Sequence, residues 1–163
     1  MSKPMLLIIL LVAMILAWGC KKPETEPVEQ APKYEFRKDG ILEIIGQDNA
    51  VKTSFEIEIV QKEEEVMRGL KNRDKMEANQ GMLFIFANPD YYDFWMQDTY
   101  LPLDMLFIGA DKIIFQIHEN AQPFSEERIS PIKPNSYVLE LNAGIAAAQK
   151  IKTGDRISWK NLP

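Results

Sequence analysis

Short apolar runs of strand length constrain the fold of this chain more than any other feature. The clearest run, residues 55–59, alternates apolar and acidic side chains. Such alternation is typical of a β-strand with one face in the core and one in water. We therefore expect the two glutamates of this run, Glu56 and Glu58, to face solvent. Similar short runs lie at residues 41–45, 82–86, 94–96, 105–108, 113–117, 137–141 and 156–159.

Two segments instead have helical character. Residues 62–70 place Val66, Met67 and Leu70 on one face, and residues 143–150 are rich in alanine after Asn142, an N-cap candidate. The predicted fold is therefore mainly β: a jelly-roll-like sandwich or small barrel of about eight short strands with two short helices.

The N-terminus resembles an export signal. Residues 5–18 are fourteen residues without a charge, whereas a membrane-spanning helix needs about 20. Lys3 precedes this run and Cys20 follows it, and small residues before a cysteine resemble the lipobox of bacterial lipoproteins. We expect residues 1–19 to be a signal peptide and Cys20 to carry the lipid. The alternative is an uncleaved N-terminal anchor.

The segment after Cys20 predicts a tether. Residues 20–38 combine three prolines with mostly charged and polar side chains, a composition that favours extended, solvated chain. Residues 39–163 then form a single domain. We expect the lipid to hold this domain at a membrane of the cell envelope, on its periplasmic or other extracytoplasmic face.

Charge and cysteine count exclude several classes of function. The net charge is −5, which argues against nucleic acid as a partner, because such binding rests on clustered lysines and arginines. Cys20 is the only cysteine, so an intramolecular disulfide or a cysteine-based metal site is excluded. His118 is the only histidine, which excludes a site with two histidine ligands. No nucleophile elbow, Walker loop or dinucleotide fingerprint is present, and we predict neither a cofactor nor a metal.

Residues 94–104 form the densest unusual stretch, with large aromatic rings, a thioether, a hydroxyl and two carboxylates. Trp95 and Met96 suit either core packing or a ligand pocket. Asp104 suits a turn cap, an ion pair with Arg68 or a ligand site. Further along the chain, a strand ends at His118, a side chain suited to metal binding or proton transfer.

Several blocks in order carry a family resemblance. They lie at residues 67–70, 81–86, 94–108, 140–144 and 154–156. Together they resemble the family known as domain of unknown function 192. The resemblance implies a compact, mainly β fold, often in exported bacterial or archaeal proteins, and it implies no activity. It directs attention to the turn at residues 142–144 and to Arg68, Trp95, Met96, Thr99 and Asp104.

These observations favour a non-catalytic binding module for a small polar ligand, a glycan or an envelope protein. The ligand-binding candidates are Arg68, Trp95, Met96, Thr99, Asp104, His118 and Glu119.

Three alternatives remain open. The first is a cell-envelope hydrolase or lyase that uses the carboxylates of Asp98 and Asp104, with Glu119 as a further candidate. The second is a Cu(I)-handling protein that uses Met96 and His118, because thioethers suit Cu(I). The third is a structural or assembly role.

Overall fold

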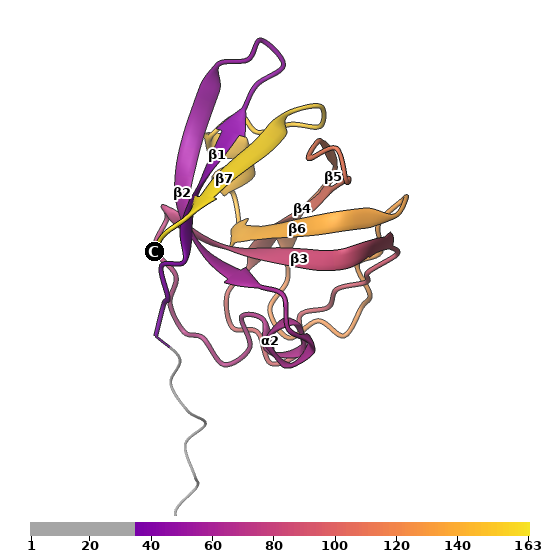
Figure 1. Cartoon of the computed structure of the whole chain (residues 1–163). Helices are drawn as coiled ribbons and strands as arrows, with labels where there is room; N and C mark the ends of the chain where they lie inside the picture. Colours follow the sequence, from indigo (N-terminus) through magenta and orange to yellow (C-terminus); the bar gives the residue numbers. More distant parts are fainter. Residues whose placement is uncertain (1–34) are drawn as a thin grey trace, which may run out of the picture. The chain divides into compact units, whose positions relative to one another are not determined.

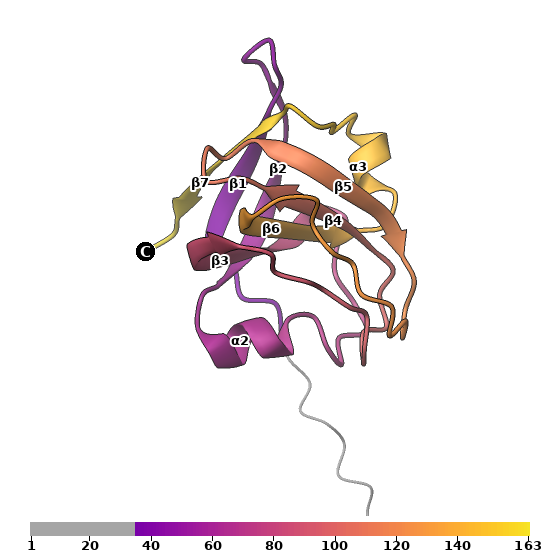
Figure 2. The same ribbon diagram turned by 90° about the vertical axis from the view of Figure 1, so that its right-hand side faces the viewer.

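The computed structural model describes residues 35–163, and the signal and lipidation predictions lie outside them. In these residues the fold is mainly β, as predicted, with seven strands in one mixed sheet and two short helices, α2 and α3 (Figures 1 and 2). The strands are β1 (Gly40–Ile45), β2 (Val51–Val60), β3 (Gln80–Asp90), β4 (Leu103–Ile108), β5 (Ile114–Ala121), β6 (Asn135–Asn142) and β7 (Arg156–Asn161). The helices are α2 (Glu63–Arg68) and α3 (Ile145–Ala148).

The eighth predicted strand, at residues 94–96, is not a strand. Phe94 forms only an isolated bridge with Ile129, through backbone hydrogen bonds of 3.0 and 2.8 Å. Met96 is buried and Phe94 is partly buried, and both side chains pack in the outer core cluster beside the sheet.

The sheet curls so that its two edge strands meet at one end. The strand order is β5-β4-β6-β3-β2-β1-β7, and only β2 and β3 pair in parallel. At the closing end, Ile113 bridges to Arg156, and the Ile114 amide donates to the Asp155 carbonyl at 2.8 Å. The sheet is therefore a partly closed barrel, which satisfies some of the backbone groups that edge strands leave unpaired.

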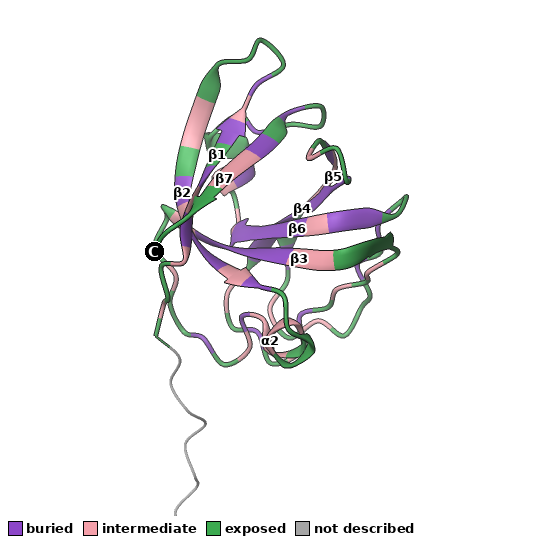
Figure 3. Cartoon of the chain, in the orientation of Figure 1, coloured by how far each residue is buried: buried purple, intermediate pink, exposed green. Residues whose placement is uncertain are grey.

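The sheet has an apolar layer on each face. The inner layer fills the barrel and includes Leu83, Leu106 and Leu139, while the outer layer includes Phe84 and Phe107. Successive side chains of a strand point to opposite faces, so β4, buried at every position, contributes to both layers (Figure 3). The outer layer needs a cover, and the site lies in that cover.

The cover comes from α2 and from the loops on either side of the Phe94–Ile129 bridge. In both Figure 1 and Figure 2, α2 lies below β3. Helix α2 begins with Glu63, Glu64 and Glu65, which favour the positive end of the helix dipole. It ends at Arg68. The next residue, Gly69, has a φ of +49° that favours glycine, and an added Cβ there would lie 3.4 Å from the Phe84 ring. This close turn brings the chain after α2 onto the outer layer.

Candidate functional site

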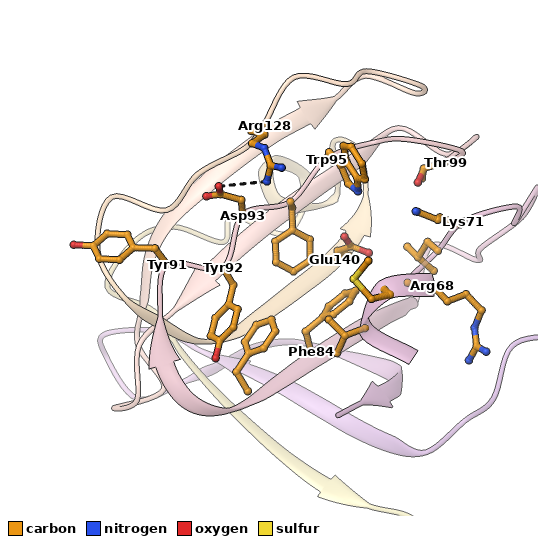
Figure 4. A pocket seen from close by; sticks show the side chains of 16 residues that line it. Arg68, Lys71, Phe84, Tyr91, Tyr92, Asp93, Trp95, Thr99, Arg128 and Glu140 are labelled. Carbon is orange, nitrogen blue, oxygen red and sulfur yellow. Dashed lines mark ion pairs between the residues drawn. The ribbon is translucent and has the colours of Figure 1, made fainter. Parts of the chain in front are cut away.

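A pocket of about 330 Å³ lies between α2, the loop at residues 91–99 and the outer face of the sheet (Figure 4). Its volume falls at the lower end of the range for small-molecule sites. Most of its lining is apolar or aromatic, with a few charged groups. The lining residues are Val66, Met67, Arg68, Gly69, Leu70, Lys71, Phe84, Phe86, Tyr91, Tyr92, Asp93, Phe94, Trp95, Thr99, Arg128 and Glu140.

The aromatic rings of the pocket brace one another. Phe86 and Tyr92 stack with centroids 3.7 Å apart, and Phe84 and Phe94 meet edge to face at 5.0 Å. Trp95 keeps 39% of its surface exposed. The walls are therefore held by ring contacts, while one ring face stays available for stacking.

Glu140 is a buried acid in the lining of this pocket. It lies on β6 opposite Met82 of β3 and Met105 of β4, so its immediate cross-strand neighbours are apolar. The residue is 4% exposed, and its Oε2 has no hydrogen-bond partner within residues 35–163. Burial raises the pKa of this carboxyl to about 8, although Arg73 acts in the opposite direction. Glu140 is therefore mostly neutral at pH 7.

A second buried acid, Glu58, lies opposite Met82 on the neighbouring strand β2 and is paired with an arginine. Glu58 of β2 accepts hydrogen bonds from both terminal nitrogens of Arg73, one of them at 2.7 Å. The prediction that Glu58 faces water is therefore wrong, because the chain after α2 covers this end of the sheet and supplies a buried arginine. Glu56 is half-buried and pairs with Lys38 at 2.5 Å.

Cationic groups surround the exposed tryptophan. The Lys71 ammonium lies 5.4 Å from the centre of a Trp95 ring, and the Arg128 guanidinium lies 5.8 Å from it. Arg128 also pairs with Asp93 at 3.6 Å. Asp93 offsets the charge of Arg128, Glu140 is largely neutral, and Lys71 adds a positive charge beside Trp95. The pocket therefore has an excess of positive charge at pH 7.

The structure brings three of the predicted ligand-binding residues together, because Arg68, Trp95 and Thr99 all line this pocket. Asp104 is not among the lining residues. It is fully buried, and its two carboxylate oxygens accept the amides of Asn120 and Ala146, each at 2.9 Å. This side chain therefore joins β4 to the end of β5 and to α3 through backbone amides that are distant in sequence.

The other predicted residues lie elsewhere. His118 of β5 is half-buried and, with the buried Met96, lines a second cavity of about 230 Å³. Glu119 is exposed and lines neither cavity, and Asp98 is exposed at a turn with a φ of +55°. Asp98 and Asp104 are thus not assembled in either cavity. In the part of the chain that the structure describes, no group of three or more His, Cys, Asp or Glu side chains is placed to hold a metal.

Sequence reasoning missed several lining residues. Glu140 had two available signals: it is an acid within the apolar run at residues 137–141, and it begins the family block at residues 140–144. No sequence signal marks Lys71, Arg128 or Tyr92 as lining residues, because each lies in a polar or mixed segment whose partners are distant in sequence.

Comparison with known proteins identifies the family of the chain. The family model described as DUF192, Uncharacterized ACR, COG1430, matches residues 44–159, and the chain belongs to this family. No curated protein matches the chain. Among the helices of residues 35–163, none is long and apolar enough to cross a membrane.

Two solved structures are similar to the chain. One is a protein from Sinorhizobium meliloti 1021 that is provisionally described as a transcription regulator. It is 36% identical to this chain with a TM-score of 0.72, and the match covers 79% of this chain and 97% of that protein. The other is a protein of unknown function from Novosphingobium aromaticivorans DSM 12444. It is 34% identical to this chain with a TM-score of 0.69, and the match covers 73% of this chain and 84% of that protein.

Proposed function

We propose that this domain is a non-catalytic binding module that holds a small polar molecule in the aromatic pocket. The observation that carries the proposal is a cavity with braced aromatic walls, an exposed Trp95 and a buried polar group, Glu140. Ligand sites commonly combine a mostly apolar lining with a few polar groups that orient the ligand. A sugar ring of a glycan also suits such a wall, since it presents both an apolar face and hydroxyl groups.

The proposal places this module in the cell envelope, tethered by a lipid on Cys20. Its support is the uncharged run at residues 5–18, directly before the small residues and the cysteine. Residues 20–38 would then separate the pocket from the membrane. The description of the S. meliloti protein as a transcription regulator suggests a different role, but the acidic balance of this chain gives no support for nucleic-acid binding.

The test is a ligand-observed NMR screen of small organic molecules against the full chain in detergent. We expect binders whose signals disappear when Trp95→Ala removes the exposed wall of the pocket. Tyr100→Ala is the matched control, because Tyr100 is an exposed aromatic outside the lining. A screen without binders, or binders equally affected by both variants, would refute the proposal.

A second candidate function is acid–base catalysis by Glu140. A carboxyl group with a pKa near 8 in an apolar pocket is the kind of group that enzymes use as a general acid. In this reading Glu140 takes the place of the Asp98 and Asp104 pair as the reactive carboxyl. One variant distinguishes the two functions. If the protein is an enzyme, Glu140→Gln should abolish turnover of its substrate, whereas a binding module has no turnover to lose.

A further inference from the structure

We infer that the ligand is a small organic anion with an apolar ring and, remote from its charge, an acceptor oxygen that receives a hydrogen bond from the buried carboxyl of Glu140. The inference rests on the proposed function and adds the chemical class of the ligand and the pH range in which it binds.

The first step is the buried carboxyl itself. Figure 4 shows Glu140 among the pocket side chains, between the labelled Trp95 and Phe84. A neutral carboxyl has one O–H to donate, and its Oε2 lacks a hydrogen-bond partner within the described residues. Leaving a buried polar group unsatisfied is costly, so a ligand that offers an acceptor at this point gains over one that does not.

The second step is the set of charges around Glu140. Its neighbours on β3 and β4, Met82 and Met105, do not titrate. Beyond them in the same cross-strand row lie Glu58 of β2 and His118 of β5. Arg73 is the charged group that favours ionisation of Glu140, but both of its terminal nitrogens bind Glu58. Burial therefore dominates, and the carboxyl keeps its proton at neutral pH.

The third step is the charge of the remaining lining. Lys71 lies just after α2 and its ammonium is 5.4 Å from a Trp95 ring, and Arg128 approaches Trp95 from another loop. Asp93 offsets the charge of Arg128, to which it is paired. The remaining excess is positive and attracts an anion, while Trp95 offers a face for the ring.

Three related probes separate these features. 4-Acetylbenzoate has the charge, the ring and a carbonyl acceptor. 4-Isopropenylbenzoate has nearly the same shape without the acceptor, and 4-methylacetophenone has the acceptor without the charge. Calorimetric titration of the full chain in detergent at pH 7 should give the tightest binding for 4-acetylbenzoate. We expect about five- to tenfold weaker binding of 4-isopropenylbenzoate, the effect of one lost hydrogen bond.

The pH dependence provides an independent test. With a pKa of about 8 for Glu140, the affinity for 4-acetylbenzoate should fall about 30-fold between pH 7 and pH 9.5. Glu140→Gln keeps a donor but does not titrate, so it should bind 4-acetylbenzoate at pH 7 within a fewfold of the unmodified chain and lose most of the pH dependence. Glu43→Gln, which changes an exposed carboxylate of β1 outside the lining, should behave as the unmodified chain.

The outcomes distinguish this inference from the proposed function. If none of the three probes binds, this inference fails, whereas the proposed function fails only if the wider ligand screen also finds no binder. If 4-acetylbenzoate and 4-isopropenylbenzoate bind equally well, or if Glu140→Gln keeps the full pH dependence, the pocket binds small molecules but this inference is overturned. The stated preference for the acceptor, together with a pH dependence that Glu140→Gln removes, supports it.

Discussion

Two buried glutamates on the outer face of the sheet illustrate how local pairing sets protonation. Glu58 and Glu140 lie in one cross-strand row with Met82 between them. Arg73 binds Glu58 with both terminal nitrogens, so that carboxylate has a compensating charge at hydrogen-bond distance. The same arginine lowers the pKa of Glu140 only through electrostatic attraction without a hydrogen bond, and burial has the larger effect on that pKa. One acid therefore contributes to an ion pair, and the other provides a neutral donor.

The first prediction concerns stability and pH. The pKa of Glu140 is about 8 in the folded chain and near 4.5 when unfolded, so the folded state holds a proton that unfolding releases. The free energy of unfolding should therefore fall, through this group, as pH rises from about 4.5 to about 8. Glu140→Gln does not titrate, and its stability relative to the unmodified chain should rise by about 2–3 kcal/mol between pH 5 and pH 7.

Urea denaturation at the two pH values measures this difference. Glu43→Gln is the control, since its exposed carboxylate should change the difference by less than about 0.5 kcal/mol. A constant difference between Glu140→Gln and the unmodified chain would show that Glu140 is ionised in the folded protein.

At the scale of elements, the segment after α2 closes the outer layer. It carries Leu70 into the outer core and Arg73 to Glu58, while Lys71 reaches the ring of Trp95. One stretch of chain thus contributes an apolar anchor, a buried ion pair and a pocket cation. The position of the pocket wall depends on how firmly this stretch is held.

The second prediction is that Arg73→Ala destabilises the domain by about 3–5 kcal/mol, because it leaves the buried Glu58 without its partner. The double variant Glu58→Gln with Arg73→Met should recover part of this loss, since it removes both charges. Thermal or urea denaturation measures both effects. Arg156→Ala, on an exposed side chain of β7, serves as the control. A loss no larger than that of the control would contradict a stabilising role for the pair.

The elements were largely predictable from the sequence, and the exceptions have physical causes. Alternation and short apolar runs identified seven strands, and helical spacing and alanine content identified both helices, because one buried face imposes a period on the side chains. Residues 94–96 have the same apolar character, yet they cover the sheet instead of extending it. Glu58 followed the expected alternation but became buried by a segment that local sequence does not reveal. Parallel pairing of β2 with β3 likewise depends on contacts between distant residues.

At the scale of the whole molecule, the pocket exists because the curled sheet leaves an apolar outer face to be covered. Arg68, Trp95 and Thr99 were candidates from sequence, and the fold places all three in the lining. Lys71, Arg128 and Glu140 come from three separate segments, so their proximity is a property of the fold and not of any motif. Asp104 shows the opposite case, a conspicuous acid whose oxygens serve two backbone amides.

The third prediction concerns the attachment of the whole molecule. If a lipid on Cys20 holds the protein, labelled palmitate should be incorporated by the unmodified chain and absent from Cys20→Ala. Once the signal peptide is removed, Cys20→Ala has no lipid, so a larger share of this variant than of the unmodified chain should be found outside the membrane fraction. Ser2→Ala is a control that keeps the cysteine. Undiminished labelling of Cys20→Ala would contradict the lipoprotein assignment.

The most direct measurement of the central claim is the titration of the Glu140 side-chain carboxyl by ¹³C NMR, with and without saturating 4-acetylbenzoate. We predict a midpoint near pH 8 in the free protein and a higher midpoint with the probe bound, because a ligand that needs the neutral carboxyl stabilises it. A midpoint near 4.5 in both states would show that Glu140 is ionised at neutral pH, and would contradict the neutral donor on which the proposed recognition depends.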